Sequence, residues 1–179
     1  MTLLEIKKKT LQLIEEISDN ANLTDDPDIK AKLNSVINQV QFELARMKKI
    51  PAFKELEVVK GQVYDLNTLD NFYQLRLLRF NGGYDLIENL AVFFEEGKAE
   101  FHYYKYPVAI TDNTPDTYEF ELSPDALEIL PYGVASDLLK SDVSTNYGAI
   151  YSQRYELMLQ RLDPRYSMAS FTIEGGVNI

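Results

Sequence analysis

Apolar positions recur at helical spacing near both ends of this chain and alternate with polar positions in its middle. Residues 2–18 and 27–49 carry apolar side chains at steps of three and four, which predicts two amphipathic helices. Asp26 and Pro27 form a favourable N-cap and first-position pair for the second helix, and Pro51 follows its predicted end. The N-terminal part is therefore expected to be helical.

The stretch from about residue 55 to residue 110 changes to short runs of alternating residues. Turn sequences separate these runs, among them Asn81-Gly-Gly83 and Glu95-Glu-Gly-Lys98. This pattern predicts a small antiparallel sheet. Its last strand, Lys98 to Tyr106, is expected to close the sheet.

The C-terminal part returns to helical spacing, with helices predicted over 124–142 and 145–162. Ser123 is the expected N-cap of the first, and Pro131 predicts a kink or a junction of two helical pieces within it. Residues 166–179 show no helical period and are predicted to form a flexible tail. The predicted fold class is α+β: a mainly helical bundle with a small antiparallel β-sheet inserted between its two helical halves. Residues 1–165 are expected to form a single domain.

Composition narrows the classes of function. The chain has 179 residues and a net charge of −10, from 18 basic and 28 acidic residues. This balance argues against a protein that grips nucleic acid through its phosphates, because that mode of binding needs clustered cations. The absence of cysteine excludes disulfides and zinc–thiolate sites. No apolar stretch reaches 18 residues, so the sequence predicts no transmembrane helix and no membrane partner.

Residues that could carry catalytic chemistry are scattered. His102 is the only histidine, and a general base needs a nucleophile and an orienting carboxylate beside it. The acidic groups at 25–28 and at 112–116 lack the spacing of a calcium loop, and Gly82-Gly83 lacks the features of a phosphate-binding loop. The sequence therefore predicts no catalytic, cofactor-binding or metal-binding residue, and no enzyme.

The aromatic residues of the last predicted strand suggest a binding surface instead. Period-two alternation places Phe101 and Tyr103 on one face and His102, Tyr104 and Tyr106 on the other. One face must pack against the core. The other either packs internally as well or meets a protein partner, and these alternatives remain open at this point. Stacking of nucleic-acid bases on the rings is a third alternative, which the acidic charge of the chain disfavours. Tyr104 and Tyr106 are accordingly candidate interface residues.

Three apolar and aromatic motifs resemble those of the head-to-tail connector, or adaptor, proteins of tailed bacteriophages. They are Tyr104-x-Tyr-Pro107, Leu130-Pro-Tyr-Gly-Val-Ala135 and the tyrosine-rich last helix that ends at Leu162. The order of predicted elements from about 27 to 165 is also similar to that of the connector fold. The helix predicted over 2–18 has no firm counterpart in this resemblance.

The resemblance implies a structural protein of the virion neck that is present in the host bacterial cytoplasm during assembly. Its copies would form a ring, of about twelve subunits, between the portal protein and the next tail or neck protein. The ring would extend the channel so that DNA passes without specific binding, and single copies would be stable as monomers before assembly. The resemblance also implies that the tail docks on the portal or on a neighbouring subunit, which makes Arg165, Tyr166, Phe171 and Ile173 candidate interface residues.

Two other classes of function compete with this one. A small ligand-binding domain or enzyme would have a pocket with converging polar groups between the sheet and the helices. An acidic host-directed inhibitor would present rows of carboxylates on one surface. The carboxylates of this sequence are spread over several predicted elements, which counts against the inhibitor.

Overall fold

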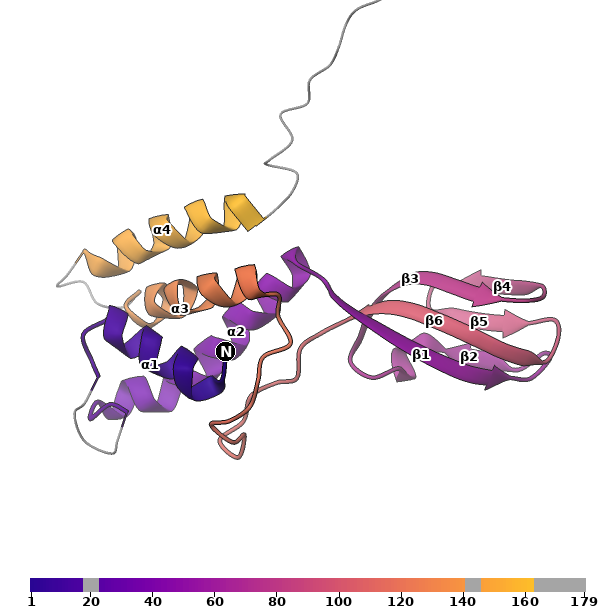
Figure 1. Cartoon of the computed structure of the whole chain (residues 1–179), viewed down its shortest axis with the longest axis horizontal. Coiled ribbons are helices and arrows are strands. Elements are labelled where there is room, and N and C mark those ends of the chain that lie inside the picture. Colours follow the sequence, from indigo (N-terminus) through magenta and orange to yellow (C-terminus); the bar gives the residue numbers. More distant parts are fainter. Residues whose placement is uncertain (18–22, 141–145, 163–179) are drawn as a thin grey trace, which may run out of the picture.

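The computed structural model describes residues 1–17, 23–140 and 146–162 of the chain. The helices gather at one end of the molecule, and the strands, between Ile50 and Lys105, form an arm at the other end (Figure 1). The helices are α1 (Leu3–Leu13), α2 (Pro27–Met47), α3 (Pro124–Leu138) and α4 (Tyr147–Leu162). The strands are β1 (Ile50–Val58), β2 (Val63–Asp65), β3 (Phe72–Phe80), β4 (Tyr84–Ile87), β5 (Leu90–Phe93) and β6 (Gly97–Lys105), with a short 3₁₀ helix over Leu66–Thr68.

The prediction of a mainly helical bundle with one small inserted sheet is wrong. The strand region that separates α2 from α3 forms two antiparallel sheets, with strand orders β1-β6-β3 and β2-β5-β4. These sheets pack on each other and enclose a core of their own, so the strand region is a small sandwich rather than one sheet laid on helices. The fold is α+β, with helices split by this strand region.

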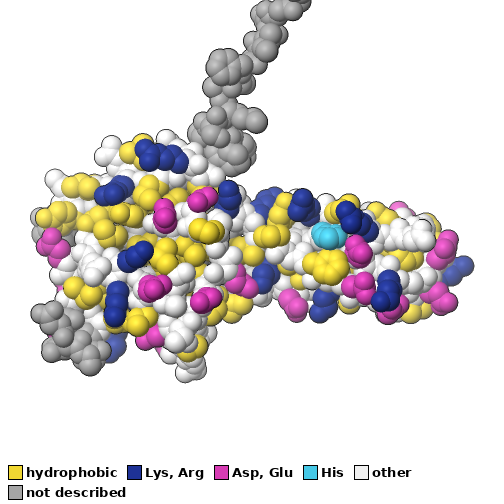
Figure 2. All heavy atoms as spheres, viewed as in Figure 1, with side chains coloured by type: hydrophobic (Ala, Val, Ile, Leu, Met, Phe, Trp, Pro, Cys, Tyr) yellow, Lys and Arg dark blue, Asp and Glu magenta, His cyan; other side chains and the backbone are white. Residues whose placement is uncertain are grey.

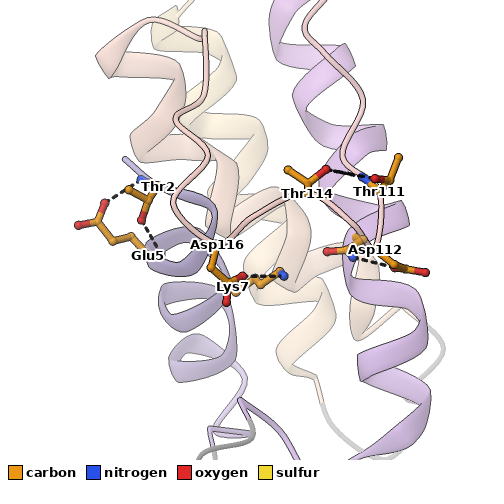
Figure 3. Close-up of polar contacts among 8 residues, drawn as sticks. Thr2, Glu5, Lys7, Thr111, Asp112, Thr114 and Asp116 are labelled. Carbon is orange, nitrogen blue, oxygen red and sulfur yellow. Dashed lines mark hydrogen bonds and ion pairs between the residues drawn. The ribbon is translucent and has the colours of Figure 1, made fainter.

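Local sequence explains where the helices begin. Thr2 and Glu5 form a reciprocal capping box at the start of α1, and Asp26 accepts hydrogen bonds from two backbone amides at the start of α2 (Figure 3 shows the first pair). Ser123 stands at the N-cap position of α3, but its hydroxyl makes no capping hydrogen bond. α3 runs as one helix through Pro131.

α3 is the central helix of the helical body, the part of the molecule formed by the four helices (Figure 1). It packs against α1, α2 and α4. Leu130 and Val134 are completely buried within this core. The connection between the arm and α3 closes the same core through Ile110, Phe120 and other apolar residues, and it also hydrogen bonds to the start of α1.

The arm has a separate core, built around Phe93 of β5 and Phe101 of β6. Their rings meet edge to face with centroids 6.3 Å apart, and both side chains are completely buried. β6 is the middle strand of its sheet, and it pairs residue for residue with β1 over nine positions. Its pairing with β3 is interrupted by two irregularities of register.

Candidate interaction surfaces

The alternation predicted for the last strand is confirmed in β6. Phe101 and Tyr103 point into the core of the arm and are buried, whereas His102 and Tyr104 are on the opposite face and are partly exposed. Burial raises the pKa of the Tyr103 phenol above its ordinary value, and the nearby Asp70 carboxylate raises it further. One face of β6 therefore packs internally and the other is open.

Tyr106 lies just beyond β6, at the joint between arm and helical body. Its ring centroid is 4.7 Å from that of Tyr73 and 5.7 Å from that of Phe42 on α2. Lys49, between α2 and β1, places its ammonium 4.9 Å from the ring centroid of Tyr104. Tyr106 is thus engaged within the chain, so of the two predicted interface tyrosines only Tyr104 belongs to an open sheet face.

We call the outward surface of sheet β1-β6-β3 the front face. Its central cross-strand row is Phe53, His102 and Leu77, with the rings of Phe53 and His102 5.0 Å apart. Phe53 is 55% exposed and Leu77 is 43% exposed. The single histidine, cyan in Figure 2, lies beside apolar side chains on this face. The row towards the helical body adds Pro51 and Tyr104, which extends the apolar surface.

Ion pairs occupy the outer part of the front face. Lys98 contacts Glu55 at 2.9 Å and Glu57 at 3.8 Å, and Arg79 contacts Glu100 at 3.9 Å. The bond to Glu55 raises the pKa of Lys98. His102 Nε2 lies 3.5 Å from Glu100 Oε2. This part of the face carries both signs of charge.

We call the outward surface of sheet β2-β5-β4 the back face, because the two sheets share the core between them. Strand pairing sets two rows across it: Val63, Val92 and Asp85, then Asp65, Leu90 and Ile87. Ile87 is 67% exposed, the highest value among the exposed large hydrophobic residues of the described chain. The back face therefore has apolar residues with an aspartate at two diagonal corners.

The helical body has a third uncovered apolar surface, on α4. Tyr147, Ile150 and Leu157 are each about half exposed and recur at steps that keep them on one side of the helix. Arg154 belongs to the same stripe, and its guanidinium lies 4.5 Å from the ring centroid of Tyr132 on α3. The stripe is apolar and basic on a chain that is acidic as a whole.

A polar groove lies between α1, α2 and the loop that precedes α3 (Figure 3), with a volume of about 390 Å³. Lys7 forms an ion pair with Asp116 at 3.3 Å, and Asn34 Nδ2 donates to Asp112 at 3.0 Å. These contacts anchor the loop to both helices. Asp112 and Asp116, the aspartates of the acidic group noted at 112–116 in the sequence, therefore hold the loop in place.

Within residues 1–17, 23–140 and 146–162, no group of three or more His, Cys, Asp or Glu side chains is arranged to hold a metal ion. His102 has a carboxylate neighbour in Glu100. Other hollows of the described structure lie within the helical body, for example one of about 450 Å³ lined by Leu13, Pro131 and Tyr132. Another of about 520 Å³ lies within the arm, between β3 and β4.

Four predicted interface residues, Arg165, Tyr166, Phe171 and Ile173, lie outside the described residues. Conversely, the sequence analysis did not identify Phe53, Leu77 or the apolar residues of the back face as exposed surface residues. A signal for Phe53 was present: in Ile50–Val58 it is a large apolar residue in phase with Pro51, Glu55 and Glu57, the exposed set of the strand.

No protein-family model matches the chain, and no curated protein sequence matches it either. Among the described helices, none combines the length and the apolar character that crossing a membrane requires.

Proposed function

We propose that this protein is a structural subunit of the head-to-tail connector of a tailed bacteriophage, and that its copies form a ring between the portal and the tail. The observation that carries the proposal is the set of uncovered apolar surfaces on both faces of the arm and on α4. Apolar surfaces of this kind typically mark contacts with other proteins.

The motifs behind the resemblance occupy positions that such a subunit needs to keep rigid. Tyr104-x-Tyr-Pro107 is at the joint between arm and helical body, where its two tyrosines contact Lys49, Tyr73 and Phe42. Leu130-Pro-Tyr-Gly-Val-Ala135 lies in α3, where five of its six residues are buried. These motifs support the proposal because they fix the orientation of the arm and the packing of the helical body.

The proposed ring acts mechanically. Each subunit contacts a neighbour on either side, and the closed ring continues the channel of the portal in the virion neck. A net charge of −10 suits a channel wall, since a wall that repels phosphate lets DNA slide without specific binding. Assembly takes place in the host cytoplasm, where single copies join the portal.

Native mass spectrometry of the purified chain over a series of concentrations, alone and with the portal protein of the same phage, tests the proposal. A closed ring of about twelve copies, or monomers that join the portal in that ratio, supports it. A monomer or dimer that is indifferent to the portal contradicts it and favours the ligand-binding or inhibitor alternatives.

A truncated chain that lacks residues 166–179 provides a matched variant for the same experiment. The proposal expects its thermal unfolding to match that of the full chain and its binding to the portal to be lost. Truncated protein that still completes infectious particles would rule out a docking role for the tail, while leaving the ring itself in place.

A further inference from the structure

The arm meets the helical body at a joint that neither core fills, and we infer that this joint is a hinge held closed by a latch of weak contacts. The cores of the two parts are separate, and helices pack chiefly on helices and strands on strands. Side chains of the joint hold the arm in the orientation that Figure 1 shows. The latch belongs to the single chain and does not depend on the ring proposed above.

The hinge consists of two short segments. Residues 48–49 lie between α2 and β1, and residues 106–107 follow β6. Ile50 and Lys105, at the arm ends of these segments, are partners in the β1–β6 ladder, which keeps the segments side by side. A change of backbone angles in both segments therefore turns the arm as one piece, as in other hinges where a few residues absorb the motion.

The side chains of α2 fix the second segment on the side of the helical body. Gln41, which is completely buried, donates to the Val108 carbonyl at 3.2 Å, and Asn38 bonds to Ile110. The chain is thus anchored to the body from Val108 onwards. Pro107 fixes its own φ angle, which limits the swing to few directions.

Lys49 is the first part of the latch. Its ammonium donates to Gln74 Oε1 on β3 at 2.7 Å, and it lies 4.9 Å from the ring centroid of Tyr104 and 5.9 Å from that of Tyr73. Lys49 belongs to the hinge, whereas its three partners belong to the sheet of the arm. Its contacts therefore set the angle between α2 and that sheet.

Tyr106 is the second part of the latch. Its ring contacts Tyr73 on β3 and Phe42 on α2, so it bridges the arm and the body. Beside it, Lys105 forms an ion pair with Glu121 in the connection that leads to α3. Each of these side chains is exposed or half-buried. The joint is thus closed by surface contacts alone.

Contacts of this kind are individually weak. A hydrogen bond or a cation–π contact at an exposed site changes an equilibrium constant by about two- to fivefold, and a surface ion pair by a similar or smaller factor. Three such contacts together favour the closed orientation by roughly tenfold to a hundredfold. A partner that binds the arm in another orientation has to overcome only this ratio, because neither core is disturbed.

Distances between spin labels on the two parts measure the swing directly. The chain contains no cysteine, so labels attach only where a cysteine is introduced. Lys60→Cys lies beyond β1 at the far end of the arm, and Lys8→Cys and Gln153→Cys lie on α1 and α4, all at exposed positions. Each body label is combined with the arm label in the full chain, and pulsed electron spin resonance gives the distance distribution of both pairs.

The latch variant carries Lys49→Met and Tyr106→Ala, which remove the ammonium and the bridging ring. We expect its distance distribution to be at least about twofold broader than that of the parent in one or both pairs. Lys54→Met is the matched control, because this lysine of β1 forms its ion pair within the arm, with Asp70 at 3.8 Å. The control and the parent should both give one narrow distribution.

Lys49→Arg separates the contacts of the ammonium from the volume of the side chain. Arginine keeps the positive charge and the hydrogen-bond donors, so its distribution should stay narrow while that of Lys49→Met alone broadens. Circular dichroism like that of the parent shows that a variant is folded. Should the double variant lose structure, the comparison of Lys49→Met with Lys49→Arg decides.

Two results would overturn the inference. A folded latch variant with distributions as narrow as those of the parent would show that other contacts hold the arm. A parent with distributions as broad as those of the latch variant would show that the latch does not close. Both results would leave the proposed ring untouched, since native mass spectrometry with the portal tests it separately.

Discussion

The phenol of Tyr155 on α4 donates a hydrogen bond to the Glu43 carboxylate on α2, with 2.9 Å between the two oxygens. Both helices pack against α3, and 112 residues of sequence separate the partners. The Tyr155 ring is buried, and it also packs against the α3 backbone near Gly133. This one side chain therefore joins three helices of the body.

Replacing Tyr155 with Phe removes the hydrogen bond and keeps the ring. We expect the free energy of unfolding to fall by about 1 kcal/mol, which is typical of an ordinary hydrogen bond and less than for a buried charged partner, because Glu43 is itself exposed. Chemical denaturation of the variant measures the change. Tyr132→Phe is the control, since the ring of Tyr132 contacts Arg154 and should keep that contact.

Substitution of Gly133 by Ala should destabilise the helical body. A Cβ at this position would lie 2.7 Å from Val40 Cγ1 and 2.7 Å from the Tyr155 ring. Overpacking of this kind typically costs about 1–3 kcal/mol, which thermal or chemical unfolding would detect. In a Val40→Ala background, the space that Val40 Cγ1 occupies beside Gly133 is free, so Gly133→Ala should lower the free energy of unfolding by less. Additive effects would show that the contact with Val40 does not cause the loss.

Asn38 ties the chain after the arm to α2 through two bonds with Ile110. Its Nδ2 donates to the Ile110 carbonyl and its Oδ1 accepts from the Ile110 amide, both at 2.7 Å. Asn38→Asp keeps the oxygen that accepts from the Ile110 amide, but it replaces the donor with a carboxylate oxygen that faces the Ile110 carbonyl oxygen. This change should lower the free energy of unfolding by about 2 kcal/mol at neutral pH. The loss should shrink near pH 3, where the carboxyl is protonated and donates again. Asn34→Ala, which removes one exposed bond to Asp112, is the matched control.

A substitution in the core of the arm should unfold the arm and leave the helical body folded, because the two cores are separate. Phe93→Ala removes a completely buried ring, and such changes cost about 3–5 kcal/mol in the core they affect. Hydrogen exchange should become faster in the strands while α2 and α3 stay protected. Phe53→Ala, on the open front face, should leave exchange in the strands unchanged. Equal loss of protection in both parts would mean that they unfold as one unit.

Stability should fall at alkaline pH. Burial, with the nearby Glu43 carboxylate, raises the pKa of Tyr155 above the ordinary phenol value of 10.0, and burial also raises the pKa of Tyr118. A group whose pKa is raised by folding contributes its full stabilisation below pH 10 and loses it as the pH rises through the folded pKa. The midpoint of thermal unfolding should therefore decrease steadily above about pH 10, and Tyr155→Phe should make this decrease shallower.

Sequence periodicity predicted those parts of the fold that local patterns control. Asp26 and Pro27 marked the start of α2, and alternation in β6 separated the buried Phe101 from the open His102. β1 begins at Ile50, whereas the predicted β region begins at about residue 55. The prediction starts late because Pro51 indicated the end of the preceding helix. A proline is tolerated there because β1 is an edge strand, where one side of the backbone needs no partner.

The second sheet was not predictable in the same way. β2, β4 and β5 have three or four residues each, which is too short for alternation to be distinguished from chance. Their assignment to a separate sheet depends on β2 pairing with β5, although β3 and β4 lie between these two strands in the sequence. Since the back face exists only through that pairing, its apolar residues could not be recognised as one surface from the sequence.

The arm starts at Ile50 and finishes at Lys105, and these two residues are partners in the β1–β6 ladder. Opposed residues of an antiparallel pair lie about 5 Å apart, so the chain leaves the helical body and returns to it at a single point. A tight turn of a few residues could bridge that gap. The arm is in this respect an exchangeable cassette: it can be lengthened, shortened or replaced by another module while the helical body keeps its own core.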